Sequence, residues 1–293
     1  MRASRLVPIV LFAALLAAVP FHAALAQSAP SLGSASGFAA LAGGPAAGAV
    51  TCTGSTVTGD VGVVSPGTSV GCTPTGTVYT NATAAYADFL FAYDSFPSIP
   101  CDQILTGTLA GVTLSPGVYC FTAAAALTGT LTLNGPADGV WIFKIGTGGT
   151  GALTGTNFSV VMAGGAAGTT CPNVYWWVAQ AATLTTSIFQ GTILAGADIT
   201  VNYSILKGDL LAGGAGSTST PTGAVTLTGS TVTACPPAGG TVVHVKVKCN
   251  QGVGNGPEGC DPGNSNQGDP SRSNDEPAGT APGNPGRKGG NGK

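Results

Sequence analysis

Leu127-Thr-Gly-Thr-Leu-Thr-Leu133 alternates leucine with small or polar residues, and the nearly continuous apolar run Val140-Trp-Ile-Phe-Lys-Ile145 follows it. Both segments have the length and residue types of β-strands. The first residues of the opening segment recur at Leu105-Thr-Gly-Thr108, Leu127-Thr-Gly-Thr130, Leu153-Thr-Gly-Thr156, Leu184-Thr-Thr-Ser187 and Leu227-Thr-Gly-Ser230. These repeats start 22, 26, 31 and 43 residues apart. A motif that returns about once per coil, with variable loops between, predicts stacked rungs and therefore a β-solenoid.

The first 26 residues have the pattern of a secretory signal peptide. Arg2 and Arg5 precede the apolar run Leu6 to Val19, and Ala24-Leu25-Ala26 supplies a cleavage site before Gln27. We therefore expect an exported protein that is secreted, extracellular or associated with the cell surface. No later segment is long and apolar enough to form a transmembrane segment.

The charge of the body, residues 27–235, excludes several classes of function. It contains two lysines and seven aspartates, and it has no Arg, Glu or His. Such a surface cannot neutralise a phosphate backbone, so we expect no nucleic acid partner. A nucleophile triad requires a histidine, and the aspartates are too scattered for the acid/base pair of a polysaccharide-active β-helix enzyme. Asp60 and Asp209 follow glycines in matching contexts and are interpreted as turn or cap residues. We expect no catalytic residue and no cofactor.

The eight cysteines all follow the signal peptide, and export makes disulfides the expected state. Proximity in sequence favours Cys52–Cys72, Cys101–Cys120 and Cys249–Cys260, which leaves Cys171–Cys235 as a long-range pair. No Cys-x-x-Cys pair occurs, and His244 has no neighbouring ligands. The sequence therefore predicts disulfide bridges and no metal site.

One segment, residues 81–96, breaks the β pattern. Its residues Ala85, Phe89, Ala92, Tyr93 and Phe96 fall on one helical face. Thr80 or Asn81 could cap the helix, and Pro97 and Pro100 would stop it. An amphipathic helix needs an apolar surface, which the flank of a solenoid provides.

Two adjacent tryptophans lie within an expected strand, Val174 to Val178. Neighbouring residues of a strand point to opposite faces of the sheet. We therefore expect one of Trp176 and Trp177 in the core and the other on the outside.

The composition changes after Cys235. Residues 236–240 have the composition of a linker, Thr241 to Lys248 alternates like one short strand, and Cys249 to Lys293 has almost no apolar residue. This last part cannot bury a core, so we expect a disordered tail. The expected organisation is a signal peptide (1–26), a solenoid domain (27–235) and a linker with tail (236–293).

Together these segments resemble the microbial ice-binding (antifreeze) proteins with a discontinuous right-handed β-solenoid fold. The matching pieces, in order, are Leu32 to Leu41, Thr58 to Val63, Leu114 to Tyr119, Leu127 to Leu133, Val140 to Ile145, Cys171 to Trp176 and Gly223 to Leu227. The resemblance implies an all-β solenoid of triangular cross-section with the helix packed alongside. It also implies a small cap region near residues 64–80, and early strands that lie among the late rungs.

The resemblance implies a protein that binds the ice crystal surface and its ordered water, through a flat face with Thr-Ala/Gly-x-Thr/Asn motifs. This sequence matches that pattern at Thr53-Gly-Ser-Thr56, Thr147-Gly-Gly-Thr150, Thr154-Gly-Thr-Asn157 and Thr228-Gly-Ser-Thr231. The candidate ice-contacting residues are Thr147, Thr150, Thr154, Thr156, Asn157, Thr228 and Thr231. A monomer is expected. The alternative is a non-catalytic adhesin or surface module that has the same fold without the flat face.

Overall fold

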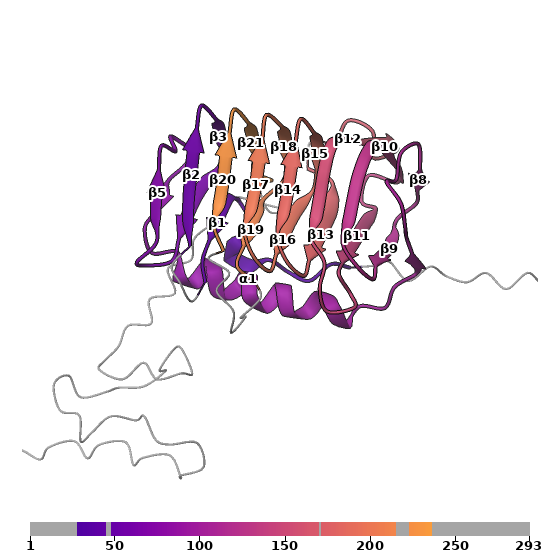
Figure 1. Cartoon of the computed structure of the whole chain (residues 1–293), viewed down its shortest axis with the longest axis horizontal. Helices are drawn as coiled ribbons and strands as arrows, with labels where there is room; N and C mark the ends of the chain where they lie inside the picture. Colours follow the sequence, from indigo (N-terminus) through magenta and orange to yellow (C-terminus); the bar gives the residue numbers. More distant parts are fainter. Residues whose placement is uncertain (1–27, 45–47, 170, 215–222, 236–293) are drawn as a thin grey trace, which may run out of the picture. The chain divides into compact units, whose positions relative to one another are not determined.

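The computed structural model describes residues 28–44, 48–169, 171–214 and 223–235. The expected signal peptide, the strand near residues 241–248, the Cys249–Cys260 pair and the C-terminal tail lie outside the described residues. The described part is a solenoid of parallel strands with one α-helix among its elements, α1 (Thr83–Ser95), as the sequence predicted. In Figure 1 the strands stand side by side, and α1 runs across them along one flank.

One of the three faces of the solenoid, the helix face, carries α1. Its strands in the described residues follow the order β6 (Val78–Tyr79), β4 (Asp60–Val63), β1 (Phe38–Ala42), β19 (Leu210–Ala212), β16 (Thr192–Ala195), β13 (Asn173–Val178), β11 (Val140–Ile145), β9 (Gly117–Phe121) and β7 (Gln103–Ile104). The Val140 to Ile145 run of the sequence is therefore β11, the third strand from one end of this face.

The other two faces meet along a bend inside the long strands β10 (Ala125–Gly135) and β12 (Leu153–Gly164). The first half of β12 pairs with β14 (Ala182–Thr185), and its second half pairs with β15 (Ile188–Gln190). The threonine face comprises the first halves of β10 and β12, then β14, β17 (Ile199–Asn202), β20 (Val225–Thr228), β2 (Ala49–Thr53) and β5 (Thr68–Val70). The mixed face comprises β8 (Thr113–Leu114), the second halves of β10 and β12, β15, β18 (Ile205–Lys207), β21 (Thr231–Thr233) and β3 (Thr56–Thr58).

The order of the coils in space differs from their order in the sequence. β1 lies between β19 and β4, β2 pairs with β20, and β3 pairs with β21. The N-terminal strands thus continue the stack beyond the last C-terminal coil, and Figure 1 shows the indigo strands beside the orange ones. This confirms the expectation that early strands lie among late rungs. The expected cap region contributes β5 and β6, which are the outermost strands of their faces at this end.

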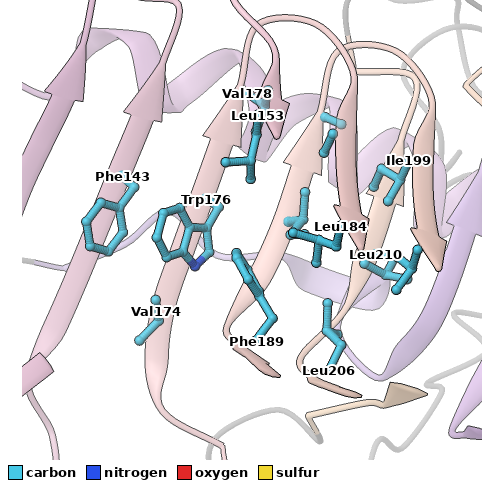
Figure 2. Packing of buried hydrophobic residues seen from close by; sticks show 14 of the residues in the cluster. Phe143, Leu153, Val174, Trp176, Val178, Leu184, Phe189, Ile199, Leu206 and Leu210 are labelled. Atoms are coloured by element: carbon cyan, nitrogen blue, oxygen red, sulfur yellow. The ribbon is translucent and has the colours of Figure 1, made fainter. Parts of the chain in front are cut away.

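The core is a column of inward-facing apolar side chains. On the threonine face these alternate with outward polar residues, whereas the strands of the helix face are largely apolar on both sides because α1 covers their outer side. At its centre the Trp176 ring stacks on Phe143 with ring centroids 3.9 Å apart, and it lies 4.8 Å from the ring of Phe189. Figure 2 shows these three rings in a row, with Phe143 in one coil and Trp176 and Phe189 in the next. The indole Nε1 of Trp176 donates to the carbonyl of Gln190 at 3.0 Å.

Helix α1 packs on the helix face through Ala85, Phe89, Ala92 and Tyr93, as the sequence predicted. The predicted cap is wrong, because the residue that precedes the helix is Ala82 and no side chain caps it. Asn81 instead accepts a hydrogen bond from the Thr83 hydroxyl. The amide of Ala82 donates to the carbonyl of Val63, which fixes the start of the helix to the sheet.

Both adjacent tryptophans are buried, on opposite sides of β13. Trp176 belongs to the core, and Trp177 points outward beneath α1, where its Nε1 donates to the Tyr93 carbonyl at 3.0 Å. The prediction of one inward and one outward ring is therefore confirmed, and the helix explains why the outward ring is not exposed.

The disulfides found among the described residues fasten the ends of the solenoid. Cys52–Cys72 joins β2 to the outermost coil, and Cys101–Cys120 joins the loop after α1 to β9. Cys171–Cys235 joins the loop before β13 to the segment that follows β21. These are the pairings that the sequence suggested for six of the eight cysteines.

Candidate functional site

The threonine face presents two parallel rows of polar β-branched side chains. Register places Thr154, Thr183, Thr200, Thr226 and Thr51 beside one another in successive coils. The second row lies two residues further along each strand and contains Thr156, Thr185, Asn202, Thr228 and Thr53. Five successive coils thus repeat Thr-x-Thr, with one asparagine in place of a threonine.

The spacing of this array follows from the geometry of a β-sheet. Neighbours within a row are about 4.8 Å apart, and the two rows are separated by about 6.7 Å. The residues between them, such as Leu184, Val201 and Leu227, are fully buried and anchor each coil to the core. Every threonine of the two rows is exposed or half-buried. The result is a flat grid of methyl and hydroxyl groups.

No charged residue occurs in the strands of the threonine face as the structure describes them. A charged side chain holds its own hydration shell, so its absence leaves the order of the surface water to the hydroxyls and methyls. Shape and rigidity, rather than electrostatic attraction, must supply affinity for any partner of this face.

A ridge of left-handed residues separates the threonine face from the mixed face. Asn157, Thr186 and Tyr203 adopt φ of 48°, 47° and 49°, and Gly229 and Gly54 follow with 55° and 58°. Positive φ is unfavourable for residues other than glycine, so the surrounding structure must impose it. The same turn is thereby repeated in successive coils, which keeps the edge of the threonine face straight.

Buried serines beneath the ridge impose this turn. The hydroxyl of Ser204 accepts from the amide of Ser187 at 3.0 Å and donates to the carbonyl of Asn202 at 2.8 Å. Ser230 repeats the arrangement by accepting from the amide of Ser204 at 3.2 Å, and Ser55 accepts from the amide of Ser230 at 3.1 Å. The ladder satisfies backbone groups that would otherwise be buried without partners. It therefore fixes one corner geometry for the coils from β12 to β3.

The structure distributes the candidate residues from the sequence over four places. Thr154, Thr156 and Thr228 lie on the threonine face, Asn157 lies on the ridge, and Thr231 lies on the mixed face. The Asn157 side chain accepts from the Thr186 hydroxyl at 2.7 Å.

Thr147 and Thr150 belong to the turn that follows β11, outside the two rows. The Thr147 hydroxyl donates to the carbonyl of Phe121 at 3.3 Å, so it also supports the turn.

Sequence reasoning missed the central members of the array, which are Thr183, Thr185, Thr200, Asn202 and Thr226, and also Thr51 at the end of its row. The sequence does contain a signal for them. The two-residue period of a strand is present in Ala182-Thr-Leu-Thr185, Ile199-Thr-Val-Asn202 and Val225-Thr-Leu-Thr228. The ends of the four-residue motif are three residues apart, so they cannot both point outward from one strand, and Thr228 and Thr231 lie on different faces.

The aspartates serve the corners of the solenoid. Asp60, Asp102, Asp198 and Asp209 accept backbone amides of Thr77, Val118, Ala224 and Cys235 at 2.7, 2.8, 2.8 and 3.0 Å. The interpretation of Asp60 and Asp209 as corner residues therefore agrees with their contacts. In the described part of the chain, no group of three or more His, Cys, Asp or Glu residues is placed to hold a metal ion.

The buried Asp209 should make stability depend on pH. Burial raises the pKa of its carboxyl group from 3.8 to about 7, although the hydrogen bonds from Cys235 and Thr192 act in the opposite direction and lower this pKa. The folded chain then keeps a proton that the unfolded chain releases. The stability that Asp209 contributes is complete below about pH 4 and is lost as the pH rises towards 7, at about 1.4 kcal/mol for each pH unit.

Urea unfolding between pH 4 and pH 8 measures this dependence. We expect Asp209→Asn, which cannot ionise, to flatten the curve over that range. Parallel curves for the two proteins would contradict the assignment.

Two hollows of the described surface lie away from the centre of the threonine face. One, of about 360 Å³, is bounded by Leu105 to Thr108 and by Phe121 to Ala124. The other, of about 470 Å³, lies between the loop after α1 and the buried Lys144. The Lys144 amine donates to the carbonyls of Pro97 and Ile99, and burial lowers its pKa. Lys144 thus fastens the end of the helix to the sheet.

The helix in the described residues is too short to cross a bilayer.

Comparisons with known proteins agree with this architecture. The model of the family described as ice-binding-like matches residues 35–233. An ice-binding protein of Nostoc sp. (strain HG1) is 37 % identical over 209 residues, which cover 66 % of this chain and 74 % of that protein.

Solved structures are similar as well. The crystal structure of an ice-binding protein from an Antarctic Biological Consortium has a TM-score of 0.60 at 32 % identity, covering 71 % of this chain and 91 % of its own. For the ice-binding protein of the Antarctic ascomycete Antarctomyces psychrotrophicus the TM-score is 0.57 at 30 % identity, covering 71 % and 99 %.

Proposed function

The chain belongs to the ice-binding-like family, and we propose that it binds ice through the threonine face. The observation that carries this proposal is the pair of in-register rows over five coils, with no charged residue in their strands. Ice is a periodic solid of oriented water molecules. A periodic surface can match it over many repeats, whereas a single pocket cannot.

The chemistry of the rows suits an ordered layer of water. Each threonine supplies a hydroxyl that donates and accepts hydrogen bonds and a methyl group that leaves neighbouring water to bond to other water. The side chain is stiff at χ1, so little conformational entropy is lost on contact. The core and the serine ladder hold the backbone in place before binding, and such preorganisation lowers the cost of association.

The contact residues follow from position on the face. Among the candidates from the sequence, we assign Thr154, Thr156 and Thr228 to the proposed contact because they lie on the threonine face, and Asn157 would flank it on the ridge. Thr147 and Thr150 flank it at the opposite edge, after β11. The array is completed by residues that are not among these candidates, which are Thr183, Thr185, Thr200, Asn202, Thr226, Thr51 and Thr53.

We further propose that the protein is non-catalytic, extracellular and monomeric, and that its partner is the ice surface. The signal-peptide pattern of the sequence supports export, and disulfides are typical of oxidising compartments. The corner contacts of Asp60, Asp102, Asp198 and Asp209 leave these carboxylates to structure rather than to chemistry.

Ice recrystallisation inhibition by the purified, oxidised protein tests the proposal. We expect inhibition at micromolar concentration, and a Thr154→Tyr, Thr156→Tyr variant should need at least roughly tenfold more protein, equivalent to about 1.4 kcal/mol. Both side chains are exposed, so the tyrosines should break the flat contact without disturbing the core.

Ala87→Tyr is the matched control, because it places the same side chain on the exposed side of α1. This variant should keep full inhibition. A folded wild-type protein that does not inhibit recrystallisation would refute ice binding. An equal loss in the control and the double variant would refute the choice of face.

A further inference from the structure

The mixed face carries its own threonine array at one end. β21 presents Thr231 and Thr233, and β3 presents Thr56 and Thr58, with Thr231 beside Thr56 and Thr233 beside Thr58. Thr231, Thr56 and Thr58 are exposed, Thr233 is half-buried, and Val232 and Val57 between them point into the core. This end of the mixed face therefore repeats the Thr-x-Thr pattern of the threonine face on the same grid.

The remainder of the mixed face lacks this array. In the row of Thr231, the preceding coils present Ile205 and Ile188, which are 50 % and 51 % exposed. In the row of Thr233, they present Lys207 and Gln190. A lysine keeps a strong hydration shell, so Lys207 marks the boundary of the array.

A single Thr-x-Thr pair recurs at the opposite end of the mixed face, in β10. On one side Thr130 lies beside Ser159 and Thr132 beside Val161, and on the other side only Thr113 of β8 lies beside Thr132, so no second threonine pair adjoins it. One pair forms a line rather than a grid.

The Thr-Gly-Ser-Thr motif connects the two faces at the end of the solenoid where the two threonine arrays meet. In Thr228-Gly-Ser-Thr231 the first threonine lies on the threonine face, Gly229 forms the ridge, Ser230 enters the serine ladder, and Thr231 lies on the mixed face. Thr53-Gly-Ser-Thr56 repeats this in the adjacent coil. Because its two threonines lie on different faces, the motif joins the two threonine arrays across one corner. Its glycine also has a steric role at one position, since a Cβ on Gly229 would meet the Tyr203 ring at 2.7 Å, whereas one on Gly54 would meet no atom within 4 Å.

We propose that Thr56, Thr58, Thr231 and Thr233 form a second ice-contacting surface, inclined to the threonine face, which binds a differently oriented plane of ice. The ridge joins the two surfaces in two coils, where β20 leads into β21 and β2 leads into β3. Both surfaces are therefore held by the same serine ladder and the same core. This inference rests on the proposed function, because the second surface uses the same chemistry on the same spacing. Figure 1 shows β3 and β21 next to β2 and β20 at one end of the stack.

The test uses the full chain, labelled with a fluorophore and adsorbed to a single ice crystal, so that fluorescence reports which planes bind. We expect the wild type to label two sets of planes. Thr56→Tyr, Thr231→Tyr should lose one set and keep the other, while Thr154→Tyr, Thr156→Tyr should show the reverse loss. Lys207→Thr should intensify the set that the first variant loses, because it extends the grid by one coil. Thr130→Tyr, in the same row at the far end of the mixed face, should change neither set.

The outcomes separate the two claims. If the wild type labels ice and the Thr56→Tyr, Thr231→Tyr variant labels the same planes as the wild type, the second surface is refuted while ice binding stands. If the folded wild type labels no plane, the proposed function and this inference both fail. Circular dichroism of each variant confirms that it is folded before it is adsorbed.

Discussion

Trp176→Ala is expected to lower the free energy of unfolding by about 3–5 kcal/mol, the usual cost of truncating a fully buried large aromatic residue. The side chain is 0 % exposed and contacts the ring of Phe143 in the preceding coil and the ring of Phe189 on the mixed face of its own coil. Phe158 meets it edge-on, with centroids 6.3 Å apart. Alanine would leave a cavity spanning several coils and would remove the donor to the Gln190 carbonyl.

Urea denaturation of the oxidised protein measures this loss. Trp176→Phe is the matched variant, because it keeps an aromatic ring in the stack, and it should lose clearly less stability. If Trp176→Ala fails to fold, the difference between Trp176→Phe and wild type still tests the packing. A loss below about 1 kcal/mol for the alanine variant would show that the ring row does not hold neighbouring coils together.

The same substitution links the core to the threonine face. Leu184 and Val201, which separate the two rows on that face, belong to the same apolar cluster as Trp176. Close-packed interiors transmit strain, so a cavity at Trp176 should disturb the alignment of the rows above it. We therefore expect Trp176→Ala to inhibit ice recrystallisation less well than wild type even at temperatures where it remains folded.

Local sequence patterns predicted the elements of this protein well. Alternation in Leu127 to Leu133 and the apolar run Val140 to Ile145 correspond to β10 and β11. Helical spacing predicted the buried side of α1, and the two-residue period predicted the opposite directions of Trp176 and Trp177. These patterns depend on neighbouring residues, so a single sequence contains them.

The site depends instead on register between coils, which local patterns do not determine. Thr200 follows Thr183 after 17 residues, but Thr226 follows Thr200 after 26, and Thr51 joins the row from the other end of the chain. Only the order of the coils in space, with β2 beside β20, aligns these residues. Thr147-Gly-Gly-Thr150 shows the opposite case, since it matches the motif but lies in a turn.

Thr200→Lys is expected to have the largest effect on ice binding of any single substitution on the threonine face. Thr200 lies in the middle of its row, between Thr183 and Thr226, so a lysine there interrupts the grid on both sides. The ammonium group is a strongly hydrated point charge, and its water shell cannot be part of an ice-like layer. A flexible side chain must also lose about 2 kcal/mol of rotamer freedom to lie flat.

Thermal hysteresis and recrystallisation inhibition, measured on the same preparations, test this expectation. Ala126→Lys is the matched control, because Ala126 is exposed and lies beside Thr154 at the end of the same row. If the whole grid acts as one contact, the central lysine should reduce activity at least about tenfold more than the terminal one, a difference of about 1.4 kcal/mol. Equal losses at the two positions would mean that the contact does not extend over the whole row. Unchanged activity in folded Thr200→Lys would place the ice contact on another face.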